Sequence, residues 1–384
     1  MAYSFLAPRE IVSGRGALES AAKKFSSYGK KALIVTDAMM VKLGNAAVLE
    51  QACRENNVDY VIYDGINAEP SDVMILDGLK AYKENHCDFL IALGGGSPID
   101  SAKAIGMMSV SDAPIASYMG KLIDVNMPGL IAIPTTAGTG SEVTKFTIIN
   151  DTATKVKMLL TGACLIPAMA VIDPKFTMTA PKSVTSHTGI DALCHAVESY
   201  TSRKAQPLSV TFSLSAIKRI FENLETCYNE PSNEAARIQM SLAATEAGLA
   251  FTNASVTIVH GMSRPIGALF HVPHGLSNAM LLEVCMNFAV DGAYDRFADI
   301  ARYLGFASAN DDDEKAARIF LEKLSGLLRN LHVPTMSEYG IDKDAYFAVI
   351  EKMAHDAYAS GSPSNTIKEV TVEDMIRLYK EVYR

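Results

Sequence analysis

The sequence predicts an α/β fold for the first half of the chain and an all-helical fold for the second half. Three observations lead to this prediction. Before Pro181, short apolar runs alternate with amphipathic stretches, whereas after it apolar residues recur at the helical period. The chain also has 384 residues, more than one ordinary hydrophobic core organises. We therefore expect two domains, residues 1–181 and residues 182–384.

The apolar runs of the first half are the expected strands. They are residues 31–36 (KALIVT), 59–63 (DYVIY), 89–93 (FLIAL), 130–133 (LIAI) and 168–172 (AMAVI). Helix-like segments such as 73–85 lie between them. Strands that alternate with helices are typical of a parallel sheet that is covered on both faces.

The second half contains amphipathic segments that predict helices. The clearest are residues 208–227, 233–252, 313–330 and 343–357. Because the strand pattern stops before them, we place the domain boundary within residues 174–182.

Composition excludes several classes of protein. The net charge is −8 and Lys and Arg form no run, which argues against nucleic acid or an anionic membrane as the partner. The six cysteines are scattered and form no C-x-x-C pair, which is typical of reduced thiols in the cytoplasm. The start of the chain lacks the pattern of a secretory signal, and no apolar stretch reaches the roughly 20 residues of a membrane span. We expect a cytoplasmic protein.

A glycine-rich turn, GGGSPID at residues 94–100, follows the third expected strand and precedes the helical stretch 101–108. Glycines let a ligand approach the backbone, and the free N–H groups at a helix start suit a pyrophosphate. A tight strand-to-helix turn explains the same glycines equally well, and the pattern is not G-x-G-x-x-G.

A second such loop, PTTAGTGSE at residues 134–142, follows the fourth expected strand. It offers the hydroxyls of Thr135, Thr136, Thr139 and Ser141. Two loops at the carboxyl ends of parallel strands outline one crevice, which is where open α/β sheets bind ligands. The first domain is therefore predicted to be a Rossmann-like dinucleotide-binding domain.

Asp37 follows the first expected strand, in VTDAMM. A carboxylate there can accept hydrogen bonds from ribose hydroxyls and repel a 2′-phosphate, which favours NAD over NADP. A helix N-cap is the equally weighted alternative.

Histidines and an aspartate form a candidate metal site in the second half. Asp191 and His195 are four residues apart on an expected helix and share one face, although such pairs also occur as plain surface contacts. His260, His271 and His274 lie within 15 residues, in a chain with eight histidines. Two of these imidazoles would complete a site for Fe²⁺, Zn²⁺ or a similar ion. Such an ion would polarise an aldehyde oxygen during hydride transfer with a nicotinamide.

Four motifs together resemble the iron-containing (group III) alcohol dehydrogenases. They are GGGSPID, PTTAGTGSE, GIDALCHAVE and H-G-M-S-R-P-I-G-x₅-P-H-G, in this order over nearly the whole chain. The resemblance implies an NAD(H)-binding first domain, a metal-binding helical second domain and an active site in the cleft between them. Fe²⁺ is the first choice of ion and Zn²⁺ the alternative.

The resemblance also implies roles for individual residues. The metal ligands would be Asp191, His195, His260 and His274. The cofactor would contact Asp37, Gly95, Gly96, Ser97, Asp100, Thr135, Thr136, Thr139 and Lys157. Phe146 and Phe251 match positions that line the substrate pocket in relatives.

The sequence departs from the family at Arg264. Many members carry a histidine there that is thought to relay protons, and arginine is a poor proton shuttle. His187 and His271 are the candidates for that catalytic role, and a backbone hydrogen bond is the structural alternative for His187. Arg264 itself would either pair with a carboxylate at the domain interface or bind a substrate with an anionic tail.

These inferences predict a metal-dependent, NAD(H)-linked alcohol dehydrogenase or aldehyde reductase of a small primary alcohol. Anionic candidates are sulfoacetaldehyde with isethionate, and succinic semialdehyde with 4-hydroxybutyrate. The alternatives are a glycerol-dehydrogenase-like polyol dehydrogenase and a non-catalytic nucleotide-binding protein. The resemblance further suggests a homodimer or larger homo-oligomer, through an added strand around residues 4–11.

Overall fold

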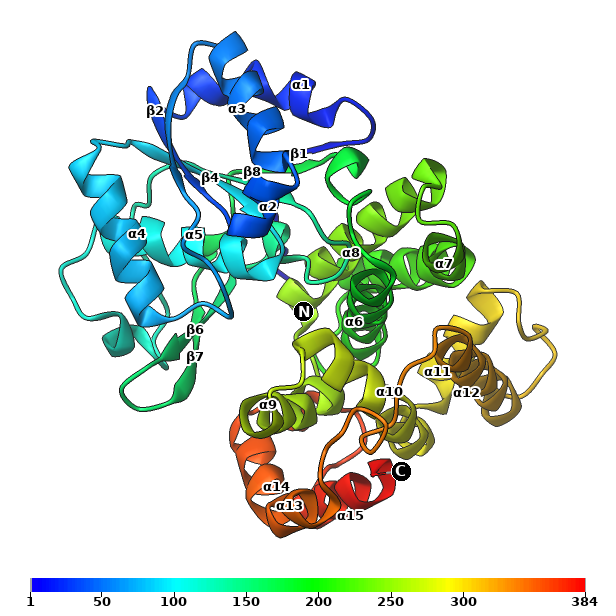
Figure 1. Ribbon diagram of the computed structural model, residues 1–384. Coiled ribbons are helices and arrows are strands. Elements are labelled where there is room, and N and C mark those ends of the chain that lie inside the picture. The colour runs from blue at the N-terminus through cyan, green and yellow to red at the C-terminus, as the bar shows by residue number, and fades with distance from the viewer. Residues whose placement is uncertain (1, 384) are drawn as a thin grey trace. The chain divides into compact units, whose positions relative to one another are not determined.

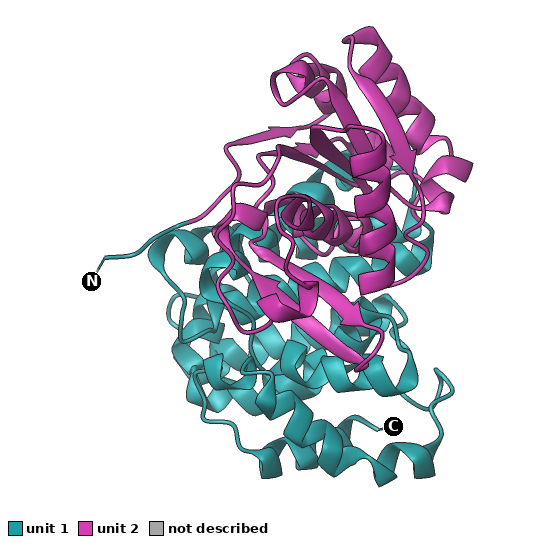
Figure 2. Cartoon of the chain, turned by 90° about the vertical axis from the view of Figure 1, so that its left-hand side faces the viewer, with its two compact units in different colours: residues 1–5, 181–384 teal, residues 6–180 magenta. Residues whose placement is uncertain are grey.

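The computed structural model describes residues 2–383, which form two compact units coloured separately in Figure 2. We call Leu6–Ala180 the sheet unit, and residues 181–383 with residues 2–5 the helical unit. In the helical unit, Gln206 Nε2 donates a hydrogen bond of 2.9 Å to the Ser4 carbonyl, and the rings of Phe5 and Phe212 stack at 5.6 Å.

Six parallel strands form the main sheet of the sheet unit, in the order β1-β8-β5-β4-β2-β3. Their bounds are β1 Glu10–Ser13, β2 Lys31–Val35, β3 Asp59–Tyr63, β4 Phe89–Gly94, β5 Leu130–Pro134 and β8 Met169–Ile172. The chain order changes direction between β2 and β4. The carboxyl ends of strands at such a reversal are where doubly wound sheets bind ligands.

Helices cover both faces of this sheet (Figure 1). Residues of β2 alternate between two cores, because neighbouring side chains of a strand point to opposite faces. Ile34 packs in one core with Leu49, and Leu33 packs in the other with Ile105. The helices of the sheet unit are α1 Ala17–Ala22, α2 Ala38–Lys42, α3 Asn45–Glu55, α4 Asp72–Glu84 and α5 Gly96–Ser109.

The predicted fold class is confirmed, with differences in detail. The structure adds β1 and the antiparallel pair β6 Phe146–Asp151 and β7 Val156–Thr161. These strands are only half-buried, so they lack the continuous apolar run that predicted the others. β1 pairs with β8 of its own chain, and residues 2–9 form no strand in the single chain.

Ten helices build the helical unit within residues 2–383. They are α6 Lys182–Tyr200, α7 Pro207–Asn229, α8 Glu234–Ala254, α9 Ile258–Phe270, α10 His274–Ala289, α11 Tyr294–Tyr303, α12 Asp313–Asn330, α13 Lys343–Ala348, α14 Ile350–Ala359 and α15 Val372–Val382. The predicted helix 343–357 is interrupted at Val349, whose φ of −114° and ψ of 3° are not helical. α6 packs against α7, α8 and α10, so it lies at the centre of the unit.

Among residues 2–383, no single helix has both the length and the apolar composition of a membrane span. Together, α8 and α9 meet that test, but they are bent by 103° at the break between them.

Candidate metal centre and cofactor loops

Asp191 and His195 lie one turn apart on α6, as the four-residue spacing predicts. Both side chains are buried, because α6 is covered almost continuously from Gly189 to Tyr200. A carboxylate and an imidazole are thus held inside the helical unit, away from bulk water. Buried polar groups of this kind need partners.

His260 on α9 and His274 at the start of α10 reach the same point. Their Nε2 atoms lie 3.6 and 3.8 Å from one Asp191 oxygen, Oδ1. The rings of His195 and His260 stack with centroids 4.5 Å apart, and those of His260 and His274 are 5.3 Å apart. Three helices therefore bring together all four predicted ligands, and we call Asp191, His195, His260 and His274 the ligand cluster.

Gly275 makes the approach of α10 to α6 possible. A Cβ built on Gly275 would lie 2.6 Å from the carbonyl oxygen of His187 and 3.3 Å from Cβ of Asp191. Any larger residue would push the start of α10 away from α6. The glycine of the P-H-G motif thus allows the preceding His274 to reach Asp191.

The chemistry of the cluster fits a divalent cation. Ligand atoms of Asp191, His195 and His260 all lie within 4.8 Å of one another. The Asn278 amide nitrogen donates to Asp191 Oδ1 at 2.7 Å and lies 3.1 and 3.2 Å from Nε2 of His260 and His274. Three acceptors thus converge on one donor, while Asn278 Oδ1 and His195 Nδ1 are buried without a hydrogen-bond partner. Three imidazoles with one carboxylate suit a first-row divalent ion.

Two residues of the ligand cluster, His195 and Asp191, have pKa values that keep them in the protonation state that a metal ion binds. Burial lowers the pKa of His195 to about 3, so its imidazole is neutral. Burial acts against the charge of Asp191, but the neighbouring imidazoles outweigh it and hold the pKa of that carboxyl well below its usual range. Burial also disfavours the charge of His260, yet the carboxylates of Glu198 and Asp191 raise its pKa to about 9. Metal binding at His260 therefore competes with a proton.

Sequence reasoning did not single out two residues of this centre, Asn278 and Glu198. Glu198 is fully buried on α6 and contacts His260 Nδ1. Both positions carry a spacing signal: Glu198 is seven residues after Asp191, and Asn278 is four residues after His274. Each therefore shares a helix face with a ligand.

The predicted substrate and catalytic residues of the helical unit differ in their surroundings. Phe251 on α8 stacks on His195, with ring centroids 4.2 Å apart and planes at 14°. His187 is half-buried on α6, one turn before Asp191, and burial lowers its pKa. His271 is exposed at the end of α9 with a φ of 54°, and no contact joins it to the ligand cluster among residues 2–383.

Arg264 follows His260 by one turn of α9 and is half-buried. Its guanidinium makes no hydrogen bond and no ion pair with any residue from 2 to 383. Burial lowers the pKa of Arg264, and the negative charge of Glu198 opposes this shift. A largely desolvated cation without a partner is unusual, since buried charges are normally paired.

The two glycine-rich loops of the sheet unit meet at the carboxyl ends of β4 and β5. Thr135 N donates to the Gly94 carbonyl at 3.0 Å, and a Cβ on Gly96 would lie 3.0 Å from Cγ2 of Thr139. Gly95 is the N-cap of α5, and no side chain caps this helix start. The first N–H groups of α5, around Ser97, are therefore available to a phosphate.

Other predicted cofactor residues already have protein partners. Asp37 caps α2, with Oδ1 accepting from Met40 N at 2.9 Å. Lys157 on β7 pairs with Glu69 at 2.7 Å. Asp100 is largely buried and accepts from Ile148 N at 3.0 Å, which ties α5 to β6.

Phe146 is the first residue of β6. Its carbonyl and that of Thr144 accept hydrogen bonds from a buried lysine. Lys103 Nζ of α5 donates to the carbonyls of Phe146 and Thr144 at 2.7 and 3.0 Å. Burial lowers the pKa of Lys103 to about 8. This ammonium therefore links the helix after the first loop to the segment after the second. Thr136 lies beside the first loop, with Oγ1 3.4 Å from the Cβ position of Gly95.

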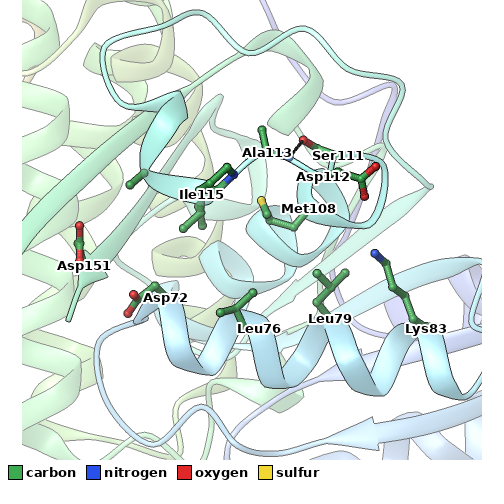
Figure 3. Close-up of a pocket in the computed structure, with 12 residues that line it drawn as sticks. Asp72, Leu76, Leu79, Lys83, Met108, Ser111, Asp112, Ala113, Ile115 and Asp151 are labelled. Atoms are coloured by element: carbon green, nitrogen blue, oxygen red, sulfur yellow. Dashed lines mark hydrogen bonds between the residues drawn. The ribbon is translucent and has the colours of Figure 1, made fainter. Parts of the chain in front are cut away.

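A cavity of about 430 Å³ lies in the sheet unit, beside α4 and the end of α5. Figure 3 shows the residues that line it. Leu76, Leu79 and Met108 form its apolar wall, and Lys83 and Asp112 lie at its edge. None of the predicted site residues lines it, so it is separate from the two glycine-rich loops.

Comparisons with known proteins agree over the whole chain. Residues 8–174 match the family model "Iron-containing alcohol dehydrogenase", and residues 185–383 match "Fe-containing alcohol dehydrogenase family, C-terminal". The chain is 33% identical to the 1,3-propanediol dehydrogenase of Citrobacter freundii over 94% of this chain and 95% of that one. A crystal structure of 1,3-propanediol oxidoreductase has a TM-score of 0.96, 30% identity and full coverage of both chains. The sulfoacetaldehyde reductase of Bifidobacterium kashiwanohense, solved with NAD⁺, has a TM-score of 0.89 and 26% identity, covering 100% of this chain and 99% of that one.

Proposed function

Since the chain belongs to the iron-containing alcohol dehydrogenase family and is thus an NAD-dependent oxidoreductase that uses a divalent metal, we propose that it interconverts a small primary alcohol and its aldehyde. The ligand cluster is the observation that carries this proposal. One carboxylate and three imidazoles, drawn from α6, α9 and α10, converge inside the helical unit. Buried charges of this kind are normally paired or coordinate a metal ion, and the family's oxidoreductase activity supplies a use for that ion.

The proposed ligands are Asp191, His195, His260 and His274. When bound, a divalent ion, Fe²⁺ or Zn²⁺, supplies Lewis acidity that favours the alkoxide over the alcohol at neutral pH. Bound NAD⁺ would supply the hydride acceptor for the alcohol carbon, and the hydroxyl proton would have to leave to a base of this chain or to water. Phe251, stacked on His195, would shield one side of the ligand cluster from water.

The cofactor would bind at the two glycine-rich loops. Gly95, Gly96 and Ser97 would present N–H groups of α5 to the pyrophosphate. Thr135, Thr136 and Thr139 would bind the rest of the cofactor. Asp100 would hold α5 in place through its bond to β6.

Two further residues would contact the cofactor from outside these loops. Asp37 keeps Oδ2 free of hydrogen bonds within residues 2–383, so it can cap α2 and still accept from a ribose. Lys157 would have to leave Glu69 to reach the cofactor.

We further propose that the aldehyde carries an anionic tail. Arg264 supports this, because its half-buried guanidinium has no ion-pair partner within residues 2–383 and sits one turn from His260. A guanidinium can bind a carboxylate or sulfonate through two charge-assisted hydrogen bonds. Sulfoacetaldehyde and succinic semialdehyde are the proposed substrates, with isethionate and 4-hydroxybutyrate as their alcohols. Phe146 matches a substrate-lining position of relatives, and we propose that it contacts the substrate as well.

A substrate panel tests both parts of the proposal. NADH oxidation is measured with sulfoacetaldehyde, succinic semialdehyde, propanal and glyceraldehyde, together with bound metal. Each charge-assisted bond is worth roughly 1.5–3 kcal/mol. We therefore expect the anionic aldehydes to exceed propanal in kcat/KM by about one to two orders of magnitude.

The Arg264→Ala variant should lose this preference, while Arg264→Lys, which keeps the charge but not the planar fork, should retain part of it. If the wild type prefers propanal and Arg264→Ala loses both substrates equally, the anionic tail is wrong. A preference for a diol would favour a polyol dehydrogenase instead.

His187 is the better of the two candidates for proton transfer. It lies on α6 one turn before Asp191, and burial keeps its imidazole neutral. His271 is exposed and has no contact with the ligand cluster among residues 2–383. We expect His187→Gln to lower kcat more than His271→Gln, as measured by steady-state kinetics. Equal effects would leave water as the proton acceptor.

We propose a cytoplasmic homodimer or larger homo-oligomer. All six cysteines are free, which is typical of a reducing compartment. Light scattering at micromolar concentration tests the assembly, and a monomer would contradict it.

A further inference from the structure

Helix α9, which carries His260, begins without a cap of its own. Thr257 is its N-cap residue, and its side chain makes no capping hydrogen bond. The cap comes from α6 instead. Glu198 Oε1 accepts from Thr257 N at 3.0 Å, Thr257 Oγ1 at 2.8 Å and Val259 N at 2.8 Å. A carboxylate at this position also faces the positive end of the helix dipole.

The second oxygen of the same carboxylate contacts the His260 ring. Glu198 Oε2 is hydrogen-bonded to His260 Nδ1, and both side chains are buried. A proton on Nδ1 leaves the Nε2 lone pair free. Nε2 faces Asp191 Oδ1 at 3.6 Å, so the free lone pair points into the ligand cluster.

We propose that Glu198 is a positioning residue of the metal centre: Oε1 fixes the start of α9, and Oε2 holds His260 in the tautomer whose Nε2 binds the metal ion. Outer carboxylates commonly orient histidine ligands in this way. The inference rests on the proposed ligand role of His260. It assigns a function to a residue that contacts neither substrate nor cofactor.

Glutamine separates this role from a purely structural cap. The glutamine side chain of Glu198→Gln has only one oxygen acceptor. The N–H groups at the start of α9 and the Nδ1–H of His260 each need an acceptor. If the amide oxygen caps α9, the amide NH₂ faces Nδ1 and drives the His260 proton to Nε2. A purely structural Glu198 would tolerate this, because the cap of α9 is kept.

The experiment measures Zn²⁺ affinity of the purified, metal-free full chain by competition with a chromophoric chelator. We expect Glu198→Gln to weaken Zn²⁺ binding about 10–100-fold. The melting temperature of the metal-free variant should stay close to that of the wild type. Glu246→Gln is the matched control. It removes a carboxylate that pairs with Arg219 at 3.1 Å in the same unit, and should leave Zn²⁺ affinity unchanged.

A double-variant cycle tests whether Glu198 acts through His260. In a His260→Ala background, Glu198→Gln should cause no further loss of Zn²⁺ affinity. Additive losses would overturn the proposal, and so would wild-type affinity in the single Glu198→Gln variant. If His260→Ala itself binds Zn²⁺ like the wild type, the ligand role of His260 fails instead.

The wild-type protein provides a test that needs no folded Glu198 variant. Long-range ¹H–¹⁵N correlation spectra of the Zn²⁺-loaded chain report histidine tautomers. We expect an Nδ1-protonated histidine signal that disappears in His260→Ala. A His260 protonated on Nε2 would overturn the proposal.

Discussion

The ligand cluster of the helical unit and the glycine-rich loops of the sheet unit are built on opposite principles. The ligand cluster consists of side chains held by neighbours from other helices, and three of the four are buried, while His274 is partly exposed. The loops offer mainly backbone N–H groups, and their geometry depends on the absence of side chains at Gly94 and Gly96. Truncating a side chain should therefore impair the ligand cluster, and adding a side chain at a glycine should impair the loops.

The largest effect is expected from removing a ligand. His260→Ala and His274→Ala should abolish turnover and lower bound metal, because three ligands hold an ion loosely. His260 should lose more metal than His274, since its side chain is 5% exposed and that of His274 is 39% exposed. Metal analysis after dialysis and NADH oxidation measure the two effects. Full activity of either variant without detectable metal would contradict the ligand assignment.

The spacing of the motifs predicted the four residues of the ligand cluster, but it did not predict the residues that surround them. Asp191 and His195 are four residues apart, so a helix alone brings them together. Glu198 and Asn278 were missed because their roles depend on helices that meet in space. Nothing in the sequence near residue 198 reveals that the start of α9 lacks a cap.

The sheet was predictable for a different reason. β2, β4 and β5 are buried on both faces, so their residues form continuous apolar runs. β1 and β7 lie at exposed edges and carry mixed residues. Lys103 also escaped prediction, because a lysine in a helix gives no sign that its ammonium will be buried against the carbonyls of Thr144 and Phe146.

The stability of the fold should also respond to pH through Lys103 of α5, whose folded pKa of about 8 lies below the usual 10.5. Below pH 8 the lysine is protonated in both the folded and the unfolded chain. The free-energy cost of burying its charge in the folded chain is then at its maximum. Between about pH 8 and 10.5 only the unfolded chain keeps the proton. The contribution of Lys103 to stability therefore rises with pH across this window.

We expect the wild type to gain on the order of 2 kcal/mol relative to Lys103→Met between pH 8 and 10.5, as measured by urea unfolding. Lys218→Met, which removes an exposed lysine of α7, serves as the control. A constant difference between wild type and Lys103→Met would show that Lys103 does not titrate in this window.

Adding one methyl to the first loop tests the backbone principle. Gly96→Ala would place a Cβ 3.0 Å from Cγ2 of Thr139. We expect about tenfold weaker NADH binding, equivalent to roughly 1.4 kcal/mol, with bound metal unchanged. Fluorescence titration measures the affinity. Thr139→Ser removes the obstructing methyl and should restore binding in the double variant, whereas failure to restore it would place the damage elsewhere.

The smallest effect is expected at Asp37, where a side chain contributes to the backbone-built region. Asp37→Ser keeps the N-cap of α2 and removes the charge. We expect the ratio of NADPH to NADH kcat/KM to rise several-fold, and Asp37→Gly should change it in the same direction. If neither variant changes the ratio, Asp37 is only a helix cap.

The attachment of residues 2–5 to α7 has a consequence for biosynthesis. Leu6–Ala180 is one continuous segment, and compact units of this kind generally fold during synthesis in chain order. Ser4, however, finds its partner Gln206 only after 202 further residues have been translated. At roughly 5–20 residues per second, this takes roughly 10–40 s. Residues 2–5 therefore reach their place in the helical unit only after the whole of Leu6–Ala180 has been translated.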